Sequence, residues 1–326
     1  MTDQIIADQH QPLVPNRTVW LDWFGDLDVI ALSERPVPQA VDDEVLVRVA
    51  AASINPVDWK MAEGEFPPKG EDQLPYALGR DVAGRIEALG TRAHNMLSVG
   101  DRVMAFIDFD RGAQADYVVV KAVELVATPD EVDDVTAAAL PLAAMTAWQG
   151  LFDHGQLQAG QRVLIHGAAG GVGHLAVQFA VWKGATVFAT AGEGDLDYVR
   201  SLGVERAIDY KNERFEHHAT NLALVFDTQG GETQVRSFDM LKKGGTLVST
   251  LDPDEAKGRA MGVRTVPRWL AQPNAAQLGE IAGLVAVGTV KVAVDRTFAL
   301  DRVRDAYAYT RDEHPRGKVV LTMAGE

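Results

Sequence analysis

Apolar residues in the first third of the chain follow the two-residue period of β-strands. Val45, Val47 and Val49, for example, alternate with other residues, the charged Glu44 and Arg48 among them, as in a strand with one buried face. Turn residues recur about every 8–12 positions, a spacing that favours a partly closed barrel. The predicted strands are 19–23, 42–52, 78–90, 99–106 and 117–120.

Three stretches in this part of the chain carry no regular apolar period. The polar residues 1–16 predict a flexible arm. The Asn55-Pro56 pair is expected to break any helix or strand within 53–60. Residues 61–77 are rich in Gly, Pro and charge, and predict a loop.

The spacing then changes to that of helices alternating with short buried strands. Residues 131–153 predict two helices interrupted at Pro141, with Asp133 or Asp134 at the start of the first. The following alternation is typical of βαβ units on a parallel sheet. The predicted strands are 162–166, 186–190, 207–209, 222–228, 246–250 and, at a sheet edge, 263–269; the predicted helices are 172–183, 195–202 and 232–242.

The end of the chain returns to the style of its first third, with a helix at 274–287 and a strand at 317–323. An α/β domain is therefore expected to be inserted into a β-rich one. The predicted division is a β-rich domain made of 17–143 and 270–326, and an α/β domain made of 144–269.

The turn between the strand at 162–166 and the helix at 172–183 indicates a nucleotide site. It contains four glycines directly before a helix whose apolar positions follow i, i+3, i+4, i+7 and i+8. Backbone N–H groups at a helix start lack partners and face the positive end of the helix dipole, which suits a pyrophosphate. A tight structural turn would give the same local pattern.

The choice of dinucleotide depends on the residue about 20 positions after such a turn. That residue is Thr190, which is not acidic, although Glu193 and Asp195 follow closely. Tyr210 and Lys211 follow the next strand, where a phenol and an ammonium can hold a 2′-phosphate, unless they are ordinary loop residues. The pattern favours NADPH, with NADH as the alternative.

Composition narrows the class of protein further. The 326-residue chain carries a net charge of −15, which disfavours nucleic acid and anionic membranes as partners. No apolar run reaches the roughly 18 residues of a membrane span, and no signal-peptide pattern is visible, so the cytoplasm is the expected location. The absence of cysteine removes thiol nucleophiles, disulfides and thiolate-bound zinc.

Five segments in a fixed order resemble a known family. They are INPVDWK (54–60), GRDVAG (79–84), ALPLAAMTAWQ (139–149), HGAAGGVG (166–173) and GKVVL (317–321). Over about 17–323 the chain resembles the zinc-independent quinone oxidoreductase branch of the medium-chain dehydrogenase/reductase superfamily. The resemblance implies an α/β fold, with a Rossmann doubly wound parallel sheet and a GroES-like partly open barrel. It also implies a homodimer, in which Val266 and its neighbours extend the sheet.

The resemblance further implies which residues meet the cofactor. Gly171 and Val172 would offer N–H groups to the pyrophosphate, and Thr146 would face the nicotinamide. Tyr210 would meet the 2′-phosphate. Lys318 lies where relatives place a basic residue near the cofactor phosphates, with an ordinary edge-strand lysine as the alternative. The full set is Asn55, Thr146, Ala168, Gly170, Gly171, Val172, Thr190, Tyr210, Lys211, Thr250 and Lys318.

The resemblance also implies that this chain has no metal. Asn55 and Asp58 stand where zinc-dependent relatives carry a metal-binding Cys and a nearby Asp. The triplet at 79–81 is Gly-Arg-Asp, where those relatives have Gly-His-Glu. Without a Lewis acid to polarise a simple ketone, quinones and α,β-unsaturated carbonyls are the favoured hydride acceptors.

Metal-free hydride transfer from NADPH to a small quinone or enone is therefore the predicted reaction. Asn55 is the first candidate, and Lys60 the second, for a hydrogen bond to the developing oxyanion. The catalytic candidates are Asn55, Asp58 and Lys60, and the expected substrate pocket is Trp59, Phe106, Phe109 and Val266. Two alternatives are an enoyl-thioester reductase of the same superfamily and an NADPH-binding sensor or scaffold protein with little turnover.

Overall fold

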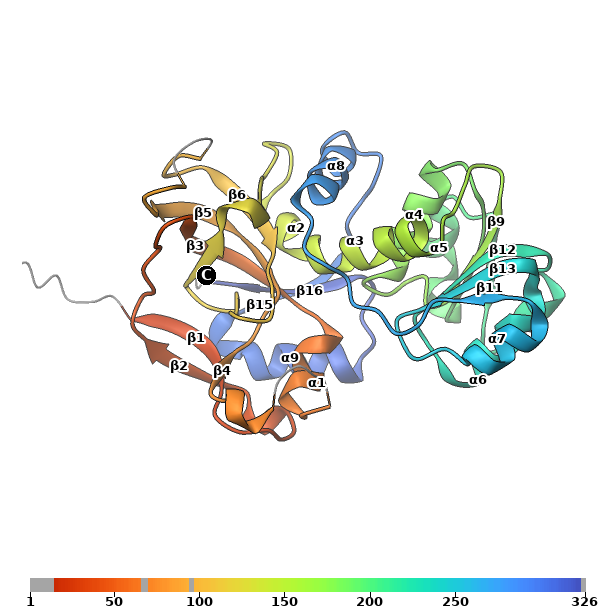
Figure 1. Ribbon diagram of the computed structural model, residues 1–326, viewed down its shortest axis with the longest axis horizontal. Helices are drawn as coiled ribbons and strands as arrows, with labels where there is room; N and C mark the ends of the chain where they lie inside the picture. The colour runs from red at the N-terminus through yellow and green to blue at the C-terminus, as the bar shows by residue number, and fades with distance from the viewer. Residues whose placement is uncertain (1–14, 66–69, 94–96, 324–326) are drawn as a thin grey trace, which may run out of the picture.

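The computed structural model describes residues 15–65, 70–93 and 97–323, which form two lobes (Figure 1). The first lobe combines the N-terminal strands with the C-terminal segment, and the second lobe contains the middle of the chain. The predicted arm at 1–16 lies outside the described residues except for its last two, and the first strand already begins at Asn16.

A parallel sheet forms the centre of the second lobe. Its order within the described residues is β11-β10-β9-β12-β13-β14, and every neighbouring pair is parallel. This order is that of a doubly wound sheet, with its switch point between β9 and β12, and it confirms the predicted fold class. The strands are β9 (Arg162–Ile165), β10 (Thr186–Ala191), β11 (Arg206–Asp209), β12 (Leu222–Asp227), β13 (Leu241–Ser249) and β14 (Arg264–Thr265). The last strand lies at the sheet edge as predicted, but is shorter than 263–269.

Helices connect these strands, as the alternating pattern predicted. They are α4 (Gly173–Trp182), α5 (Leu196–Ser201), α6 (Gly231–Ser237) and α7 (Glu255–Met261). The predicted helix at 232–242 is too long, because a 3₁₀ turn at Phe238–Met240 ends it and buries both of its terminal side chains. Helix α7 was not predicted.

The first lobe contains a mainly antiparallel sheet of order β15-β16-β3-β5-β6-β8, with β7 also paired to β3, and a smaller sheet of order β2-β1-β4. The eleven-residue β3 pairs with β5, β7 and β16 along different parts of its length. The strands are β1 (Asn16–Leu21), β2 (Ala31–Arg35), β3 (Glu44–Ile54), β4 (Tyr76–Ala77), β5 (Asp81–Leu89), β6 (Arg102–Phe106), β7 (Tyr117–Lys121), β8 (Leu125–Ala127), β15 (Val294–Ala299) and β16 (Lys318–Thr322).

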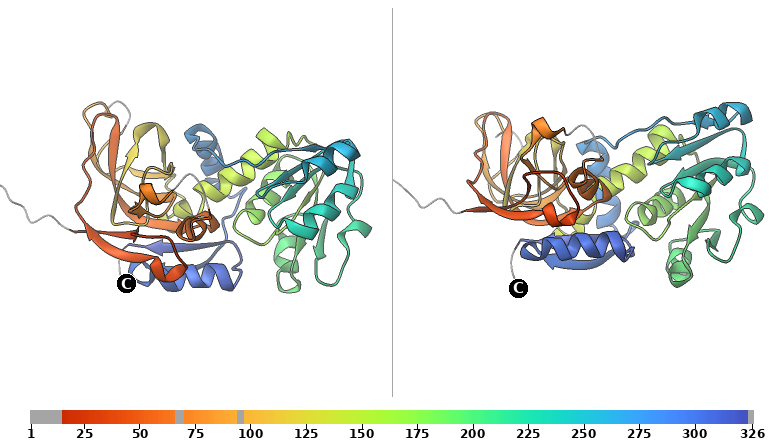
Figure 2. Two further views of the ribbon diagram at one scale, coloured as in Figure 1. Left: turned by 60° about the horizontal axis from the view of Figure 1, so that its bottom comes forward. Right: turned by 90° about the horizontal axis from the view of Figure 1, so that it is seen from below.

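The C-terminal segment completes the sheet of the first lobe. β16 lies between β15 and β3, and α9 (Val303–Asp312) packs along the same lobe (Figure 2). Lys318 is therefore not an edge-strand lysine. It is 4% exposed, because its side chain packs against Gly171 and reaches Ile54 and Asn55. Neither β15 nor α9 was predicted.

A short helix replaces the predicted break within 53–60. Helix α1 (Pro56–Ala62) has Pro56 at its first position, where a missing N–H costs nothing and the fixed φ suits the helix. Asp58 Oδ2 accepts the backbone N–H of Asn55 at 2.8 Å, the back-bond of a capping box. The Asn-Pro pair starts a helix here instead of interrupting one.

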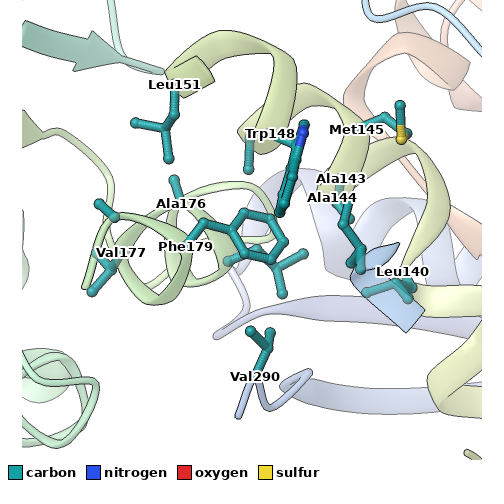
Figure 3. Packing of buried hydrophobic residues seen from close by; sticks show 14 of the residues in the cluster. Leu140, Ala143, Ala144, Met145, Trp148, Leu151, Ala176, Val177, Phe179 and Val290 are labelled. Carbon is teal, nitrogen blue, oxygen red and sulfur yellow. The ribbon is translucent and has the colours of Figure 1, made fainter. Parts of the chain in front are cut away.

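Helices α2 (Asp134–Ala139), α3 (Pro141–Trp148) and α8 (Ala275–Ala286) connect the two lobes. Pro141 separates the first two as predicted, and Asp133 caps the first by accepting the N–H of Thr136 at 2.9 Å. Small residues of α3 allow α4 to approach closely, with the rings of Trp148 and Phe179 edge-on at 5.3 Å (Figure 3). The core around them contains side chains from both lobes. In the described part of the chain, no helix is long and apolar enough to cross a membrane.

Candidate active site

The glycine turn lies at the carboxyl edge of the parallel sheet, between β9 and α4. Gly167 has a φ of +70°, a conformation that favours glycine. A Cβ on Gly173 would lie 2.8 Å from the Cα of Ala168 and closer still to the carbonyl oxygen of Gly167, so the helix starts in contact with the turn. Within the described residues, the N–H of Val172 donates to no backbone carbonyl, whereas Gly171 lies in the β-bridge that joins Gly170 to Gly317. The turn therefore offers a donor to an anion.

Two residues at the ends of β9 and β10 hold this turn from inside. Thr190 is buried, and its Oγ1 lies 3.0 Å from Nδ1 of His166. Its carbonyl oxygen accepts the N–H of Ala168 at 2.9 Å, and Ala168 is buried as well. Thr190 thus supports the turn through its carbonyl, while its buried hydroxyl is engaged by His166.

Tyr210 and Lys211 lie at the rim beside the turn. A Cβ on Gly192, which follows β10, would be 3.9 Å from the Tyr210 ring, so the ends of the second and third strands do converge. Tyr210 is 57% exposed, and Nζ of Lys211 lies 5.7 Å from its ring centroid. The structure thus brings a phenol and an ammonium together where they can meet a phosphate.

The other two predicted cofactor residues, Thr250 and Thr146, lie directly after β13 and on α3. The N–H of Thr250 donates to the carbonyl of Asp227 at 3.0 Å, and the hydroxyl of Thr146 on α3 donates to the carbonyl of Leu142 at 2.8 Å. Asp227 is fully buried, and it accepts the N–H groups of Gln229 and Gly230 at 2.9 and 3.0 Å.

Asp81 connects the two lobes through its carboxylate. It begins β5 and is fully buried. Its Oδ1 accepts the N–H of Leu142 in the first turn of α3 at 2.7 Å. Its Oδ2 accepts Nδ2 of Asn55 at 2.8 Å and the hydroxyl of Ser53. One side chain therefore caps the connecting helix and holds the residue before α1.

Lys318 holds the other end of the Asn55 carboxamide. Its Nζ donates to Oδ1 of Asn55 and, at 2.9 Å, to the carbonyl of Ile54, and it lies 4.0 Å from Oδ2 of Asp81. Burial lowers the pKa of Lys318, while the charges of Asp81 and Asp58 oppose that shift. The ammonium thus faces Ile54 and Asn55, directly before α1.

Asp58 is a buried carboxyl group with one free oxygen. Its Oδ2 accepts from Asn55 and faces Nε2 of Gln114 at 3.4 Å, whereas Oδ1 has no hydrogen-bond partner among the described residues. Burial raises the pKa of Asp58 to about 7, against the lowering effect of the Asn55 N–H. The hydroxyl of Tyr307 donates to Oε1 of Gln114 at 2.7 Å, so Gln114 links Tyr307 to Asp58.

Arg80 lies beside the aromatic residues of the expected pocket. Its guanidinium is 3.4 Å from the ring centroid of Phe109 and 5.0 Å from that of Phe106, and its Nε donates to the carbonyl of Ile107 at 2.7 Å. Desolvation lowers the pKa of Arg80. Arg80 occupies the middle position of the Gly-Arg-Asp triplet and is itself buried.

The four expected pocket residues fall into two groups. Trp59 and Phe109 are half-buried and pack against the core of the first lobe. Phe106 and Val266 are only 2% and 6% exposed and belong to the core that spans both lobes. The two pairs therefore belong to different cores, and only Trp59 and Phe109 are partly exposed.

Lys60 is the remaining catalytic candidate. It lies in the last turn of α1 and is half-buried. Its ammonium has no hydrogen bond or ion pair within the described residues. No group of three or more His, Cys, Asp or Glu side chains in the described part of the chain is placed to hold a metal ion.

Sequence patterns did not indicate Ser53, Gln114, Asp227 or Tyr307 as site residues. Ser53 and Asp227 are single polar residues in or beside an apolar run, which is a sign of burial but not of a partner, whereas Gln114 and Tyr307 lie in mixed segments. Two of the pairs are distant along the chain: Ser53 and Asp81 are 28 positions apart, and Gln114 and Tyr307 are 193 apart. No spacing motif can reveal such pairs.

A doubly wound sheet with a glycine turn, joined to a β-rich lobe that supplies buried polar groups, defines the class of dinucleotide-dependent oxidoreductases. Comparison with known families agrees. Residues 41–130 match the alcohol dehydrogenase GroES-like domain, and residues 202–321 match the family described as zinc-binding dehydrogenase.

Known relatives identify the branch. The chain is 35% identical to the chloroplastic NADPH-dependent alkenal/one oxidoreductase of Arabidopsis thaliana, over 97% of this chain and 82% of that protein. It is 32% identical to the chloroplast envelope quinone oxidoreductase homolog of the same plant, over 88% and 92%. The solved quinone oxidoreductase of Coxiella burnetii is 32% identical, with a TM-score of 0.87 over 95% of this chain and all of that one.

The chain belongs to the quinone and alkenal oxidoreductase branch of the medium-chain dehydrogenase/reductase superfamily. The predicted resemblance and the predicted combination of a GroES-like domain with a Rossmann-type sheet are thereby confirmed.

Proposed function

We propose that this protein is an NADPH-dependent reductase of quinones or α,β-unsaturated carbonyls. The observation that carries the proposal is the contact between the glycine turn and the polar cluster of the first lobe. Gly170 forms a β-bridge with Gly317, and a Cβ on Gly171 would lie 3.0 Å from Cδ of Lys318. A dinucleotide on this turn would thus extend toward Asn55. Relatives named for NADPH-dependent alkenal/one reduction and for quinone reduction support the proposal.

The residues of the second lobe fit NADPH. When bound, NADPH supplies the hydride and the chain supplies position and electrostatics. Gly171 and Val172 would donate their N–H groups to the pyrophosphate, and Tyr210 and Lys211 would hold the 2′-phosphate. Thr146 and Thr250 would border the remainder of the cofactor. NADH lacks the 2′-phosphate and would lose only the contacts with Tyr210 and Lys211.

Lys60 is the residue that we assign to the substrate oxygen. The two N–H groups of the Asn55 carboxamide have Asp81 at 2.8 Å and Ser53 at 3.4 Å as acceptors, so Asn55 would have to give up one of them to donate to a substrate. The Lys60 ammonium has no such partner and can donate to a developing enolate or quinolate oxygen. Asn55 and Asp58 then position the start of α1, and Trp59 and Phe109 form the apolar wall of the substrate site.

Oxidation of NADPH in the presence of a panel of quinones and enones tests this function. We expect turnover with acceptors of both types, and a Lys60→Ala variant whose kcat/KM falls by about 10- to 100-fold. Lys121→Ala, in a strand of the first lobe, is the matched control. Tight NADPH binding without turnover on any acceptor would refute the proposal and favour a sensor or scaffold. Turnover confined to enoyl thioesters would favour the enoyl-thioester reductase.

Cofactor choice has its own test. Tyr210→Phe and Lys211→Ala should weaken NADPH binding by about tenfold together, since charge-assisted hydrogen bonds to phosphate are lost. NADH affinity should remain unchanged. Equal losses for both dinucleotides would place the 2′-phosphate elsewhere.

We further propose that residues 144–269 form the cofactor domain, and that 17–143 with 270–326 form the catalytic domain. The proposal is supported by the parallel sheet, which lies wholly between residues 162 and 265, and by the pairing of β16 with β3. A homodimer that joins the edge strands β14, and a cytoplasmic location, stay predictions. Analytical ultracentrifugation of the full chain would test the dimer.

A further inference from the structure

The residues around Gly317 attach the C-terminal segment to the glycine turn. The N–H of Gly317 donates to the carbonyl of Ala169 at 2.8 Å. Gly317 has a φ of +80°, and a Cβ on it would lie 2.7 Å from that of Ala293, so glycine is required here. The next residue, Lys318, donates its N–H to the carbonyl of Ala293 at 2.9 Å. The backbone of Lys318 is thus fixed against the cofactor turn.

The side chain of Lys318 leads from this turn into the first lobe. Its stem passes Gly171, and its Nζ reaches the carbonyl of Ile54 and Oδ1 of Asn55. Both ends of the side chain are therefore engaged, one at the predicted pyrophosphate turn and the other at the loop that precedes α1. The ammonium itself does not face the turn.

We propose that Lys318 is a positioning residue that fixes the Asn55 side chain, and so couples the glycine turn to helix α1, which carries Lys60. This inference rests on the function proposed above. A carboxamide has two nearly isosteric orientations, which only its hydrogen-bond partners distinguish. The cation of Lys318 requires the oxygen, and the anion of Asp81 requires the nitrogen. Both charges select the same orientation.

This role differs from direct phosphate binding in what it affects. If Lys318 held a cofactor phosphate, its removal would lower the affinity for the dinucleotide. Lys318 donates to Ile54 and Asn55, so its removal should leave cofactor affinity nearly unchanged and misplace the groups that act on the substrate. Small misplacements of catalytic groups reduce the rate strongly.

The first experiment separates rate from affinity. In Lys318→Met, which keeps the length of the stem, kcat should fall by about 10- to 100-fold, with the Kd for NADPH within about threefold of wild type. Lys183→Met, at the exposed far end of α4, is the matched control and should keep both values. A large rise in Kd with normal kcat would overturn the proposal and show a phosphate contact.

A double-mutant cycle tests whether Lys318 acts through Asn55. If it does, adding Lys318→Met to an Asn55→Ala protein should lower kcat by no more than about twofold, because the residue it positions is already absent. Additive losses would overturn the proposal. The cycle uses only Lys318→Met and Asn55→Ala, so it does not depend on whether an arginine at position 318 fits the buried space.

The pH profile adds a readout that a purely structural role would not change. The charged groups facing Lys318 are Asp81 of β5 and Asp58 of α1, and the neutral His174 of α4 lies on its other side. Wild-type kcat should decline at alkaline pH as the ammonium loses its proton. Lys318→Arg should retain part of the rate and move that decline to higher pH, because a guanidinium does not titrate there. An identical alkaline limb in both proteins would contradict the proposal.

An activity-independent measurement keeps this inference distinct from the proposed function. Amide hydrogen exchange of residues 55–58 in the cofactor-free protein should accelerate in Lys318→Met and stay unchanged in Lys183→Met. Unchanged exchange in Lys318→Met would overturn the positioning role even if the wild type reduces quinones. Faster exchange in a protein that reduces no acceptor would support the positioning role and refute only the reductase function.

Discussion

Replacing Gly173 by alanine tests whether close contact between α4 and the glycine turn shapes the anion site. The added Cβ would meet the Cα of Ala168 and the carbonyl carbon of Gly167 at 2.8 Å, where real Cβ atoms essentially never approach below 3.0 Å, and the carbonyl oxygen of Gly167 closer still. All three atoms belong to the backbone, so no side-chain rotation can relieve the overlap. The helix and the turn must move apart.

The expected cost follows from that displacement. Overpacking a close contact typically costs about 1–3 kcal/mol, which exceeds the helix propensity of up to about 1 kcal/mol that alanine gains over glycine. The N–H groups of Gly171 and Val172 directly precede the substituted position and would move with it. We therefore expect a lower Tm by a few degrees, and NADPH binding weakened about tenfold or more.

Thermal unfolding and a fluorescence titration with NADPH measure both effects. Gly283→Ala is the control, because this exposed glycine lies inside α8 and a Cβ there meets nothing within 4 Å. It should raise the stability by roughly 0.5–1 kcal/mol and leave the Kd unchanged. A Gly173→Ala protein with wild-type Tm and Kd would refute the reasoning.

Three further substitutions have distinct expected outcomes. Asp81→Ala leaves the N–H of Leu142 and the Nδ2 of Asn55 without an acceptor, so urea unfolding should show a loss of about 3–5 kcal/mol; a loss below 1 kcal/mol would mean that the lobes do not depend on this carboxylate. Asp58→Asn tests the pKa of about 7, which is raised from 3.8: the stability from the protonated carboxyl is present below the lower value and lost as pH rises through the higher one. The Tm of the wild type should therefore fall between about pH 4 and 7 more steeply than that of Asp58→Asn, and parallel curves would contradict the buried, protonated carboxyl. Arg316→Ala removes a half-exposed ion pair with Asp195 at 2.7 Å, and should cost less than about 1 kcal/mol; a larger change in Tm would show that this pair does more than bridge the surface.

The fold could be predicted where a local pattern determines the structure. The parallel sheet followed from apolar runs separated by helical spacing, and Pro141 correctly marked the boundary of two helices. The pattern failed for α1, because Asn-Pro was interpreted as a break, although the Asp58 three residues after Asn55 is the sign of a capped start. It also failed for α9, whose buried Val303, Ala306 and Tyr307 follow helical spacing in a mainly polar segment.

The site was predictable only where one segment supplies it. The glycine turn and the Tyr210–Lys211 pair are local, and the structure brings them to the same edge of the sheet. Lys318 was singled out from a resemblance, but the direction of its ammonium depends on Asn55, which lies 263 positions away. A hydrogen bond of that kind is determined by the pairing of β16 with β3, and sequence spacing contains no information about it.

Asp81 shows why the polar cluster and the fold cannot be treated separately. Its Oδ1 caps α3, the helix that joins the lobes, while its Oδ2 orients Asn55 in front of the glycine turn. Lys318 approaches the same carboxamide from the opposite side and is attached by its backbone neighbour to that turn. The two charged groups are buried and 4.0 Å apart, so each offsets part of the desolvation cost of the other. The groups that would orient the substrate therefore also set how the two lobes meet, and a substitution at either charge should change both properties together.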